Sequence, residues 1–479
     1  MNVLFTASEC APVVKVGGLG DVVGSLPIAL DQIDINCAVV IPAYKPLIDS
    51  QATLFTNRLL HTEVKFGEKA EPVNVFKTVI PKTKIPLYLI QNDTYLSNGG
   101  IYFDATAFVT SQGEIDRFAF FSKALAQVFL DEPGCDFKPD VIHCHDWHTG
   151  FVPKLVADIV PTVFTIHNLA NQGFSSVDVA QKLGLDINKS KILSWDALDS
   201  NLDFIMQGIL NATFITTVSP TYAREILTPI FGEGLHEVLE AREGRLYGIL
   251  NGIDCSVWNP EKDPYIKPNF NLKSLDKKQE CKVALQTALD LPSTPKKPIL
   301  AVVSRLTTQK GIDMIISLMD EILGLGCQLV VLGTGDPSLE NKLRIKEAEL
   351  AKEGLFEARV LLEYNEELAH KIYAGSDIFL VPSRFEPCGL TQMIAMRYGT
   401  IPLVRQVGGL ADSVVSGKTG FSFVNFNDSE FLDALKRALN YYSYKDEWRK
   451  LVTNAMEQDF SWAESAKKYA DIYQLALDE

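Results

Sequence analysis

The residues with the clearest chemical potential lie at positions 382–392, in the string PSRFEPCGLTQ. An apolar run at 378–381 precedes them and predicts a buried parallel strand, so Glu386 follows the carboxyl end of that strand. Gly389 then opens a predicted helix over 390–398. Open α/β sheets bind ligands at this edge, and phosphates favour helix N-termini, where backbone N–H groups and the helix dipole converge. The segment therefore predicts an anion-binding turn beside a lone acid, which suits a substrate that joins a diphosphate to a centre turning cationic.

A repeated glycine motif supports a ligand site of this kind. The string V-G-G-L-x-D follows a predicted strand near each end of the chain, at 16–21 and at 407–412. Each copy opens a helix, and its glycine pair lets the backbone approach a ligand closely. An ordinary glycine turn explains either copy alone. The repetition, with Lys15 directly before the first copy, favours two nucleotide-sugar half-sites that face each other.

A basic loop follows the first predicted strand of the second half of the chain, at 304–311 (SRLTTQKG). If the two half-sites face each other, Arg305 and Lys310 lie where a diphosphate would lie. Arginine makes planar bidentate contacts and lysine acts as a point charge, a suitable pair for a departing nucleotide. A solvated basic loop is the alternative. The string GTGD at 333–336 is a weaker signal and indicates a turn by itself.

Three histidines and an aspartate end another predicted strand, in the string HCHDWH at 143–148. A metal-dependent hydrolase built on His143, His145 and His148 is one alternative, since imidazoles and carboxylates bind metals. The string comes near the H-x-H-x-D-H pattern of metallo-hydrolases. However, Asp146 falls one residue early, and no later His or Asp clearly completes a ligand set. Polar groups that grip sugar hydroxyls are the favoured interpretation.

Single polar residues follow other predicted strands. His167 and Asn168 come after one of them, where a capped turn with a satisfied histidine is the alternative. Asn251 precedes a glycine and is by default part of a turn. Tyr364 lies beyond a late strand and offers a ring that a base can stack on.

Composition excludes several classes of protein. At 479 residues the chain exceeds one core, so two domains are expected. A formal charge of -15, from 45 basic and 60 acidic residues, argues against nucleic acid or anionic membrane as the main partner. No segment approaches the roughly 20 apolar residues that a membrane span needs. The N-terminus lacks the features of a signal peptide, so a bacterial cytoplasmic protein, or a plastid stromal protein in trimmed form, is expected.

The eight cysteines are scattered, with no C-x-x-C pair, which is typical of reduced cytosolic thiols. Cys388, beside the acid, is either a nucleophile or, as we favour, a small residue that fills a tight turn.

The order of predicted elements indicates an α/β protein with two Rossmann-like, doubly wound domains. The predicted strands are 3–7, 38–41, 87–90, 141–143, 163–167, 215–218 and 247–250, and then 299–303, 329–332, 360–362, 378–381 and 401–404. A proline-punctuated stretch separates the two series, as in an interdomain connection. A capping box, SWAE at 461–464, opens a last helix predicted to cross back onto the first domain. The predicted boundaries are 1–250, 251–458 and 459–479.

Together these strings resemble one family, the bacterial glycogen synthases and plant starch synthases, which are ADP-glucose-dependent glucan synthases of GT-B architecture. The resemblance runs nearly end to end and in family order. It rests on KVGGL (15–19), HDWH (145–148), TIHNL (165–169), VSPTYARE (218–225), LNGID (250–254), SRLTTQKG (304–311) and FEPCGLTQ (385–392). The string QMIAMRYG (392–399) looks most like the starch synthases of classes three and four.

The resemblance implies a role for each matched position. Catalytic roles are implied for Glu386, His167, Asp146, Arg305 and Lys310. Contacts with ADP-glucose are implied for Lys15, Gly18, Asp21, Asn168, Asn251, Arg305, Lys310, Tyr364, Cys388, Gly389, Leu390 and Thr391. In this assignment Arg305 and Lys310 hold the diphosphate, and Tyr364 faces the adenine. The glucose is held by Asp146, His167 and Asn251, and Glu386 sits at the reacting sugar.

Two positions depart from related sequences. Ile394 stands where other retaining transferases carry a second glutamate, as is usual in glucan synthases. Synthases of this family also often have a lysine near Gln207. This chain lacks that lysine, which bears on how it contacts the glucan acceptor.

The implied reaction is transfer of glucose from ADP-glucose to the non-reducing end of an α-1,4-glucan or maltooligosaccharide, with retention. Without an evident second carboxylate, front-face attack is favoured over a covalent intermediate on Glu386. No cofactor and no metal are expected, and neither nucleic acid nor membrane is an expected partner. A catalytically weak glucan-binding or initiation protein on the same scaffold is the other alternative beside the hydrolase.

Overall fold

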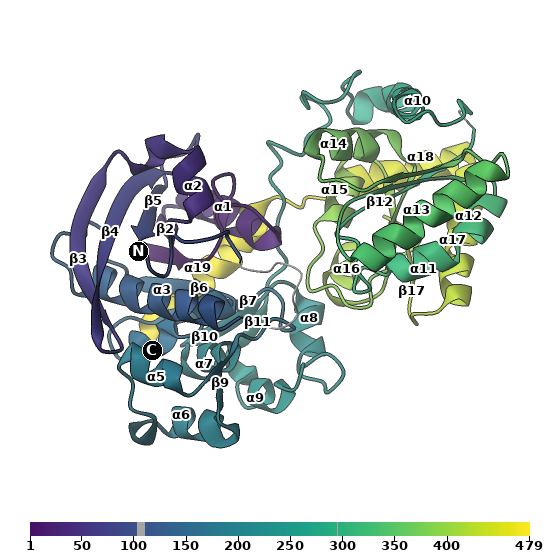
Figure 1. Ribbon diagram of the computed structural model, residues 1–479. Helices are drawn as coiled ribbons and strands as arrows, with labels where there is room; N and C mark the ends of the chain where they lie inside the picture. Colours follow the sequence, from purple (N-terminus) through teal and green to yellow (C-terminus); the bar gives the residue numbers. More distant parts are fainter. Residues whose placement is uncertain (103–110, 295) are drawn as a thin grey trace. The chain divides into compact units, whose positions relative to one another are not determined.

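The computed structural model describes residues 1–102, 111–294 and 296–479 (Figure 1). Contacts between Cα atoms divide these residues into two units, each built on its own sheet. Unit 1 comprises Met1–Gly252 and Trp462–Glu479, and unit 2 comprises Ile253–Ser461. The boundaries predicted from the sequence follow residues 250 and 458.

In the described part of unit 1, nine strands form one sheet in the order β11-β10-β7-β6-β1-β2-β5-β4-β3. These strands are β1 (Asn2–Thr6), β2 (Asn36–Pro42), β3 (Arg58–Phe66), β4 (Lys69–Val79), β5 (Pro86–Gln91), β6 (Val141–His145), β7 (Thr162–Ile166), β10 (Phe214–Thr217) and β11 (Leu246–Gly248). β4 pairs antiparallel with β3 and with β5, whereas the remaining pairs are parallel. β8 (Phe174–Ser176) and β9 (Asn201–Asp203) form a separate antiparallel pair.

Two helices from opposite ends of the chain share the main core of unit 1. α1 (Gly18–Asp31) and α19 (Trp462–Asp478) bury apolar side chains in one cluster with alternate residues of β1, such as Val3 and Phe5. The side of α19 that the sequence predicts to be apolar is the buried one, with Trp462, Ala466, Tyr469 and Tyr473 each at most 6% exposed. The last helix therefore completes the first unit.

The described part of unit 1 contains further α-helices, most of them labelled in Figure 1. They are α2 (Lys45–Ser50), α3 (Gln112–Leu130), α4 (Val152–Leu155), α5 (Asp178–Leu183), α6 (Lys191–Asp196), α7 (Phe204–Asn211), α8 (Pro220–Glu225) and α9 (His236–Glu240).

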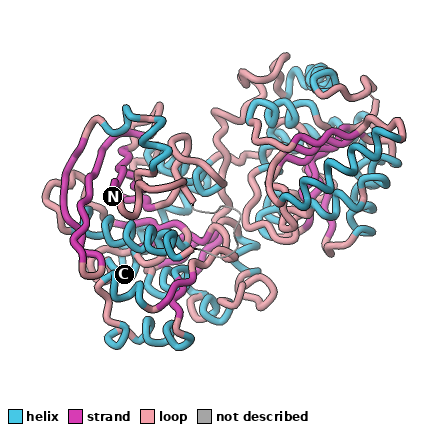
Figure 2. The backbone as a smooth tube through the Cα atoms, in the orientation of Figure 1, coloured by secondary structure: helices cyan, strands magenta, loops and turns pink. Residues whose placement is uncertain are grey.

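The described part of unit 2 contains a six-stranded parallel sheet in the order β14-β13-β12-β15-β16-β17, with helices on both sides (Figure 2). Its strands are β12 (Ile299–Val303), β13 (Gln328–Leu332), β14 (Ala358–Leu361), β15 (Ile378–Val381), β16 (Ile401–Arg405) and β17 (Phe421–Phe423). Its α-helices are α10 (Lys278–Ala288), α11 (Ile312–Ser317), α12 (Met319–Gly324), α13 (Pro337–Lys352), α14 (Glu366–Gly375), α15 (Thr391–Arg397), α16 (Gly408–Ser413), α17 (Asp428–Ser443) and α18 (Lys445–Met456).

The strand order of each unit reverses at one place, and this place matters for function. Counted from its first strand, unit 2 has the order 3-2-1-4-5-6 of dinucleotide-binding folds. The reversal lies between β12 and β15 in unit 2 and between β1 and β6 in unit 1. Ligands of open α/β sheets bind beyond the carboxyl ends of the strands at such a switch point. The loops after these four strands are therefore the expected positions of ligand-binding residues.

The predicted α/β class with two doubly wound domains is confirmed, but the sequence analysis missed the β3–β4 hairpin. Buried parallel strands are nearly continuous apolar runs, and such runs identified the strands that were predicted. β3 instead carries exposed Arg58, His61 and Glu63 among its apolar residues, since it lies at the edge of the sheet. The short strands β8, β9 and β17 were missed as well. Within the residues that the structure describes, no helix is both long and apolar enough to span a membrane.

Candidate active site

At the switch point of unit 2, the structure joins the predicted acid to one of the predicted cations. The ammonium of Lys310, after β12, lies 2.6 and 2.8 Å from the two carboxylate oxygens of Glu386, after β15. The hydroxyl of Ser383 donates a hydrogen bond of 2.9 Å to the same carboxylate. Glu386 is only 5% exposed. A buried carboxylate needs a charged partner or hydrogen-bond donors, and here it has both.

The loops that carry these two side chains are tied together along the backbone. The N–H of Arg384 donates to the carbonyl of Gln309 at 2.8 Å. Gly311 has φ +71°, and a Cβ atom there would lie 2.2 Å from the carbonyl oxygen of Pro382. Only glycine fits so close an approach, so the distance between the Lys310 and Glu386 backbones is set by main-chain contact.

The second copy of the glycine motif supports the turn that contains Glu386. A Cβ atom on Gly408 would lie 1.9 Å from the carbonyl oxygen of Glu386, and one on Gly409 would lie 2.1 Å from that of Cys388. The N–H of Gly409 donates to the Glu386 carbonyl at 3.1 Å. The sequence predicted that these glycines let the backbone approach a ligand, whereas what they approach in the structure is the protein's own backbone.

The residues after Glu386 form a tight turn into α15. Gly389 has φ +70°, and α15 begins at Thr391 with Leu390 as its N-cap, one residue later than predicted. Gln392 holds the turn by donating to the carbonyl of Gly389 at 2.6 Å and to the Ser413 hydroxyl at 3.0 Å. Cys388 is buried within the turn at 6% exposure.

The remaining predicted residues of unit 2 present exposed side chains. Arg305 is exposed and makes no ion pair with any described residue, although its loop is fixed by a hydrogen bond of 2.8 Å from the N–H of Leu306 to the carbonyl of Thr334. The GTGD string thus serves as a backbone support for the basic loop. Tyr364 is 77% exposed and lies between β14 and α14.

At the switch point of unit 1, the loop after β1 carries the first copy of the glycine motif. Lys15 pairs with Asp21 at 2.8 Å, and Gly18 begins α1. A Cβ atom on Gly17 would meet no atom within 4 Å, so this glycine faces open space, unlike its counterparts in unit 2. Sequence analysis missed Glu9, whose buried carboxylate accepts hydrogen bonds from the backbone of this loop. A lone glutamate after a strand gives no sequence signal.

The predicted sugar-binding residues of unit 1 meet after β6 and β7. Asp146, at the unusual φ of +55°, accepts hydrogen bonds from the N–H groups of His167 (2.7 Å) and Asn168 (3.4 Å). Burial raises the pKa of Asp146 to about 7, against the opposing effect of these hydrogen bonds. Burial lowers the pKa of His167 to about 3, so this imidazole is neutral at physiological pH. Backbone strain at Asp146 fits a functional position.

The three histidines of the HCHDWH string have different partners. His143 contacts the hydroxyls of Tyr473 (2.7 Å) and Thr165 (2.6 Å), and His145 Nδ1 lies 2.9 Å from His167 Nε2. His148 packs against the ring of Phe118, with ring centroids 4.6 Å apart. No group of three or more metal-binding side chains occurs among the described residues. The metal-dependent hydrolase thus gains no support from how these imidazoles are arranged.

Three buried polar atoms of the predicted site residues and the HCHDWH string lack a protein partner in the described part of unit 1. They are Oδ1 of Asn251, a predicted glucose contact, Nε2 of His145 and Nδ1 of His148. Buried polar atoms are nearly always hydrogen-bonded in folded proteins, so an unpartnered one indicates a place for a ligand or water.

The two departures from related sequences are both buried. Ile394 lies in α15 at 5% exposure, packed as an apolar residue where other transferases have an acid. Gln207 lies in α7 and donates a hydrogen bond of 2.6 Å to Asp196, whose pKa burial raises to about 6. Gln207 therefore stabilises a buried carboxylate.

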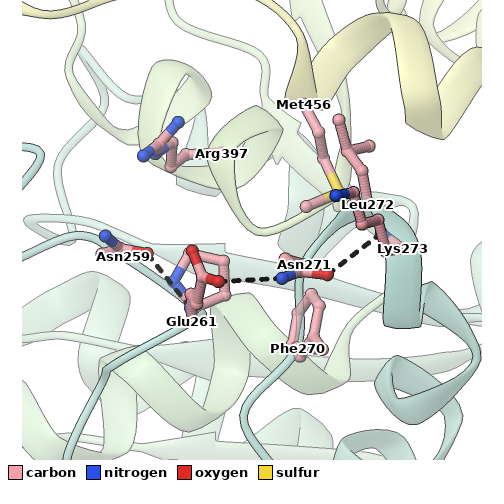
Figure 3. Close-up of a pocket in the computed structure, with 9 residues that line it drawn as sticks. Asn259, Glu261, Phe270, Asn271, Leu272, Lys273, Arg397 and Met456 are labelled. Atoms are coloured by element: carbon pink, nitrogen blue, oxygen red, sulfur yellow. Dashed lines mark hydrogen bonds between the residues drawn. The ribbon is translucent and has the colours of Figure 1, made fainter.

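A separate pocket of about 360 Å³ lies in unit 2 (Figure 3). It is lined by Asn259, Pro260, Glu261, Phe270, Asn271, Leu272, Lys273, Arg397 and Met456. The Asn271 amide donates to the Glu261 carboxylate at 2.9 Å, and the Glu261 N–H donates to Asn259 at 3.1 Å. No predicted site residue lines this pocket, so we place the candidate site at the switch points instead.

Comparison with known proteins agrees with this architecture. The family model described as the starch synthase catalytic domain matches residues 2–241, and the one described as glycosyl transferases group 1 matches residues 289–456. The chain is 40% identical to a glycogen synthase of Desulforamulus reducens, over 100% of this chain and 99% of the relative. It is also 40% identical to a glycogen synthase of Bacillus cereus, over the whole of both chains.

Solved structures give the same result. The catalytic domain of starch synthase IV from Arabidopsis thaliana, bound to ADP and acarbose, is 35% identical and superposes with a TM-score of 0.89 over 100% of this chain and 99% of that one. Sucrose-phosphate synthase from Thermosynechococcus elongatus, at 17% identity and a TM-score of 0.62, shares the fold.

The fold and the family matches thus define a glycosyltransferase of GT-B architecture. The chain belongs to the glycogen synthase and starch synthase family, and it is a glucosyltransferase. The predicted resemblance to this family is confirmed.

We predict that Gly408→Ala reduces turnover at least 100-fold while the protein still folds. The new methyl group would collide with the Glu386 carbonyl and displace the turn, and loss of one preorganised charged group costs on the order of 10²-fold in turnover. The matched control is Gly417→Ala in the same unit. Gly417 also has positive φ (+75°), but a Cβ atom there meets nothing within 4 Å. Equal activity in the two variants would refute the support role of Gly408.

We also predict that Asp196→Asn stabilises the protein increasingly as pH rises from 4 to 7. Because burial raises the pKa of Asp196 to about 6, the folded state holds this proton more tightly than the unfolded state, so the contribution of Asp196 to wild-type stability falls over that range. The gain should be on the order of 1–2 kcal/mol, since one pKa unit corresponds to about 1.4 kcal/mol. Melting temperatures at pH 5 and 8 test this, with the exposed Asp93→Asn as control. A pH-independent difference between variant and wild type would contradict it.

Proposed function

We propose that this enzyme transfers glucose from ADP-glucose to the 4-hydroxyl at the non-reducing end of an α-1,4-glucan, with retention. The observation that carries the proposal is the full-length match to a starch synthase structure that holds ADP and acarbose. The ion pair of Glu386 with Lys310 at the switch point of unit 2 supports it, since a charged pair at that edge suits a reaction that separates charge.

The cations of unit 2 act on the leaving group in this scheme. As the bond from glucose C1 to the diphosphate breaks, negative charge grows on the phosphate, and interactions that strengthen at that moment accelerate the reaction. Arg305 has no ion-pair partner in the described residues and is exposed, so it is available to a diphosphate. Lys310 lies against Glu386, where one ammonium can contact both the acid and the leaving phosphate. Leu390 and Thr391, at the start of α15, supply backbone N–H groups nearby.

The other donor contacts are proposed residue by residue. Lys15 and Gly18 contact the donor with Asp21 beside them, and Tyr364 stacks on the adenine. Asp146, His167 and Asn251 hold the glucose, and the unpartnered Oδ1 of Asn251 is suited to a sugar hydroxyl. The neutral imidazole of His167 is a hydrogen-bonding group rather than a charge. Asn168 lies beside it on the backbone that Asp146 holds. In this scheme no cofactor takes part.

We propose that retention results from front-face attack: the acceptor hydroxyl approaches glucose C1 from the same face as the leaving phosphate. A covalent route needs a second acid, and the corresponding position is the buried Ile394. Glu386 is held by Lys310 and Ser383, an arrangement that fixes the position of its carboxylate. It then stabilises the positive charge on the sugar ring, while the leaving phosphate accepts the proton of the acceptor hydroxyl.

We expect Glu386→Gln to reduce turnover at least about 100-fold with little change in ADP affinity, because the charge matters in the transition state and the amide keeps the shape of the side chain. Steady-state kinetics and calorimetric ADP binding separate the two effects. The control is Glu340→Gln, a carboxylate of the same unit that accepts a hydrogen bond from the N–H of Gly335. Turnover of Glu386→Gln close to that of the control would remove Glu386 from the reaction.

For the donor, we expect kcat/KM to be higher with ADP-glucose than with UDP-glucose in the presence of a maltooligosaccharide. Tyr364→Ala should lower kcat/KM for ADP-glucose markedly, because stacking on a base contributes roughly 1–3 kcal/mol. Stacking tolerates any base, so the variant should not become specific for UDP-glucose. The exposed Tyr444→Ala in the same unit is a control. Equal use of both donors by the wild type would overturn the donor assignment, and unchanged kinetics in Tyr364→Ala would remove this residue from the site.

A further inference from the structure

Glu9, in the loop after β1, is a buried carboxylate that accepts three hydrogen bonds. It is 3% exposed. One carboxylate oxygen accepts hydrogen bonds from the N–H groups of Val16 (2.6 Å) and Gly17 (2.9 Å). The other oxygen accepts a hydrogen bond of 2.6 Å from the hydroxyl of Tyr102. Hydrogen bonds to a carboxylate are among the strong ones, and both oxygens are used.

The part of the loop that Glu9 holds, Val16 and Gly17, has little side-chain packing. Val16 is 49% exposed, and a Cβ atom on Gly17 would meet nothing within 4 Å, so side-chain packing does not fix this backbone. Gly17 is the N-cap of α1 but has no side chain to cap the helix. The Glu9 carboxylate therefore holds the backbone of Val16 and Gly17, next to the ion pair of Lys15 with Asp21.

Glu9 also lies close to the second half of the site in unit 1. Its negative charge is one of the causes that raise the pKa of Asp146, after burial. The residues that Glu9 binds, Val16 and Gly17, lie directly between Lys15 and Gly18. The charge of Glu9, in the loop after β1, thus acts on Asp146, in the loop after β6, across the switch point.

We propose that Glu9 is a positioning residue for the donor, which holds the backbone of Val16 and Gly17 so that Lys15 and Gly18 meet ADP-glucose. The inference rests on the proposed function of Lys15 and Gly18. It assigns to Glu9 no contact with the substrate. A residue of this kind changes donor binding through the loop, whereas a residue that only stabilises the fold lowers stability and affects both substrates alike.

The test compares Glu9→Ala, Glu9→Gln and Lys15→Ala in the full-length chain. We expect Glu9→Ala to raise the KM for ADP-glucose and the dissociation constant of ADP about 10-fold or more, since two charge-assisted hydrogen bonds to the loop are lost. The KM for a maltooligosaccharide should stay within about 2-fold of the wild-type value. Glu9→Gln should recover part of the donor affinity, because its amide oxygen can still accept an N–H and its amide nitrogen can donate to Tyr102.

The control is Glu71→Gln, which alters another buried carboxylate of unit 1, one that accepts a hydrogen bond from Thr94. It should change neither KM.

If Lys15→Ala raises the donor KM and the Glu9 variants do not, positioning by Glu9 is wrong although the proposed function stands. If the Glu9 variants lose stability and affinity for both substrates together, with no recovery in Glu9→Gln, the role is only structural and the inference is overturned. If Lys15→Ala leaves donor binding unchanged, the proposed role of the loop fails and the inference fails with it. If Glu9→Ala does not fold, Glu9→Gln is compared with Glu71→Gln instead. A raised KM for ADP-glucose with an unchanged KM for the maltooligosaccharide, in Glu9→Gln alone, supports positioning, and unchanged KM values overturn it.

Discussion

Reversal of the strand order is the constraint on which the candidate site depends. Parallel strands end at one edge of their sheet. At a switch point the segments that follow two adjacent strands turn to opposite faces of the sheet, so a crevice opens between their two loops. In unit 2 this brings together the loops after β12 and β15, with Lys310 and Glu386. In unit 1 it brings together the loops after β1 and β6, with Glu9 and Asp146. Each unit thus presents a buried acid at the same topological position.

These buried acids are used in two ways. Glu386 is compensated by an ammonium and a hydroxyl, which leaves a charged side chain fixed at the edge of the sheet. Glu9 and Asp146 instead accept backbone N–H groups and hold loops in place. A carboxylate that binds backbone donors orders a loop without an apolar core, which suits a loop that must stay accessible to a ligand. Buried carboxylates therefore serve both the chemistry of the candidate site and the positioning of its loops.

Glycines do the corresponding work on the main chain. Gly311 and Gly408 each allow one loop to approach a backbone carbonyl of another loop. A side chain at either position would push the two loops apart. Gly17 differs because its surroundings are open. Two copies of one short motif, at 16–21 and 407–412, consequently have different roles, one at an accessible loop and one beneath the Glu386 turn.

The sequence by itself determined the α/β class, the strands at 299–303 and 378–381, the acid at the end of a strand and the membership of the family. These features are local: an apolar run, a turn residue or a motif of eight residues can be read without knowing what it contacts. Only the tertiary structure decided the β3–β4 hairpin, because an edge strand keeps polar residues that hide its pattern. It also decided the pairing of Lys310 with Glu386, which are 76 residues apart, and the hold of Glu9 on the loop before α1. The physical reason is that a hydrogen bond or an ion pair depends on distance in space, and the packing of the sheet sets that distance.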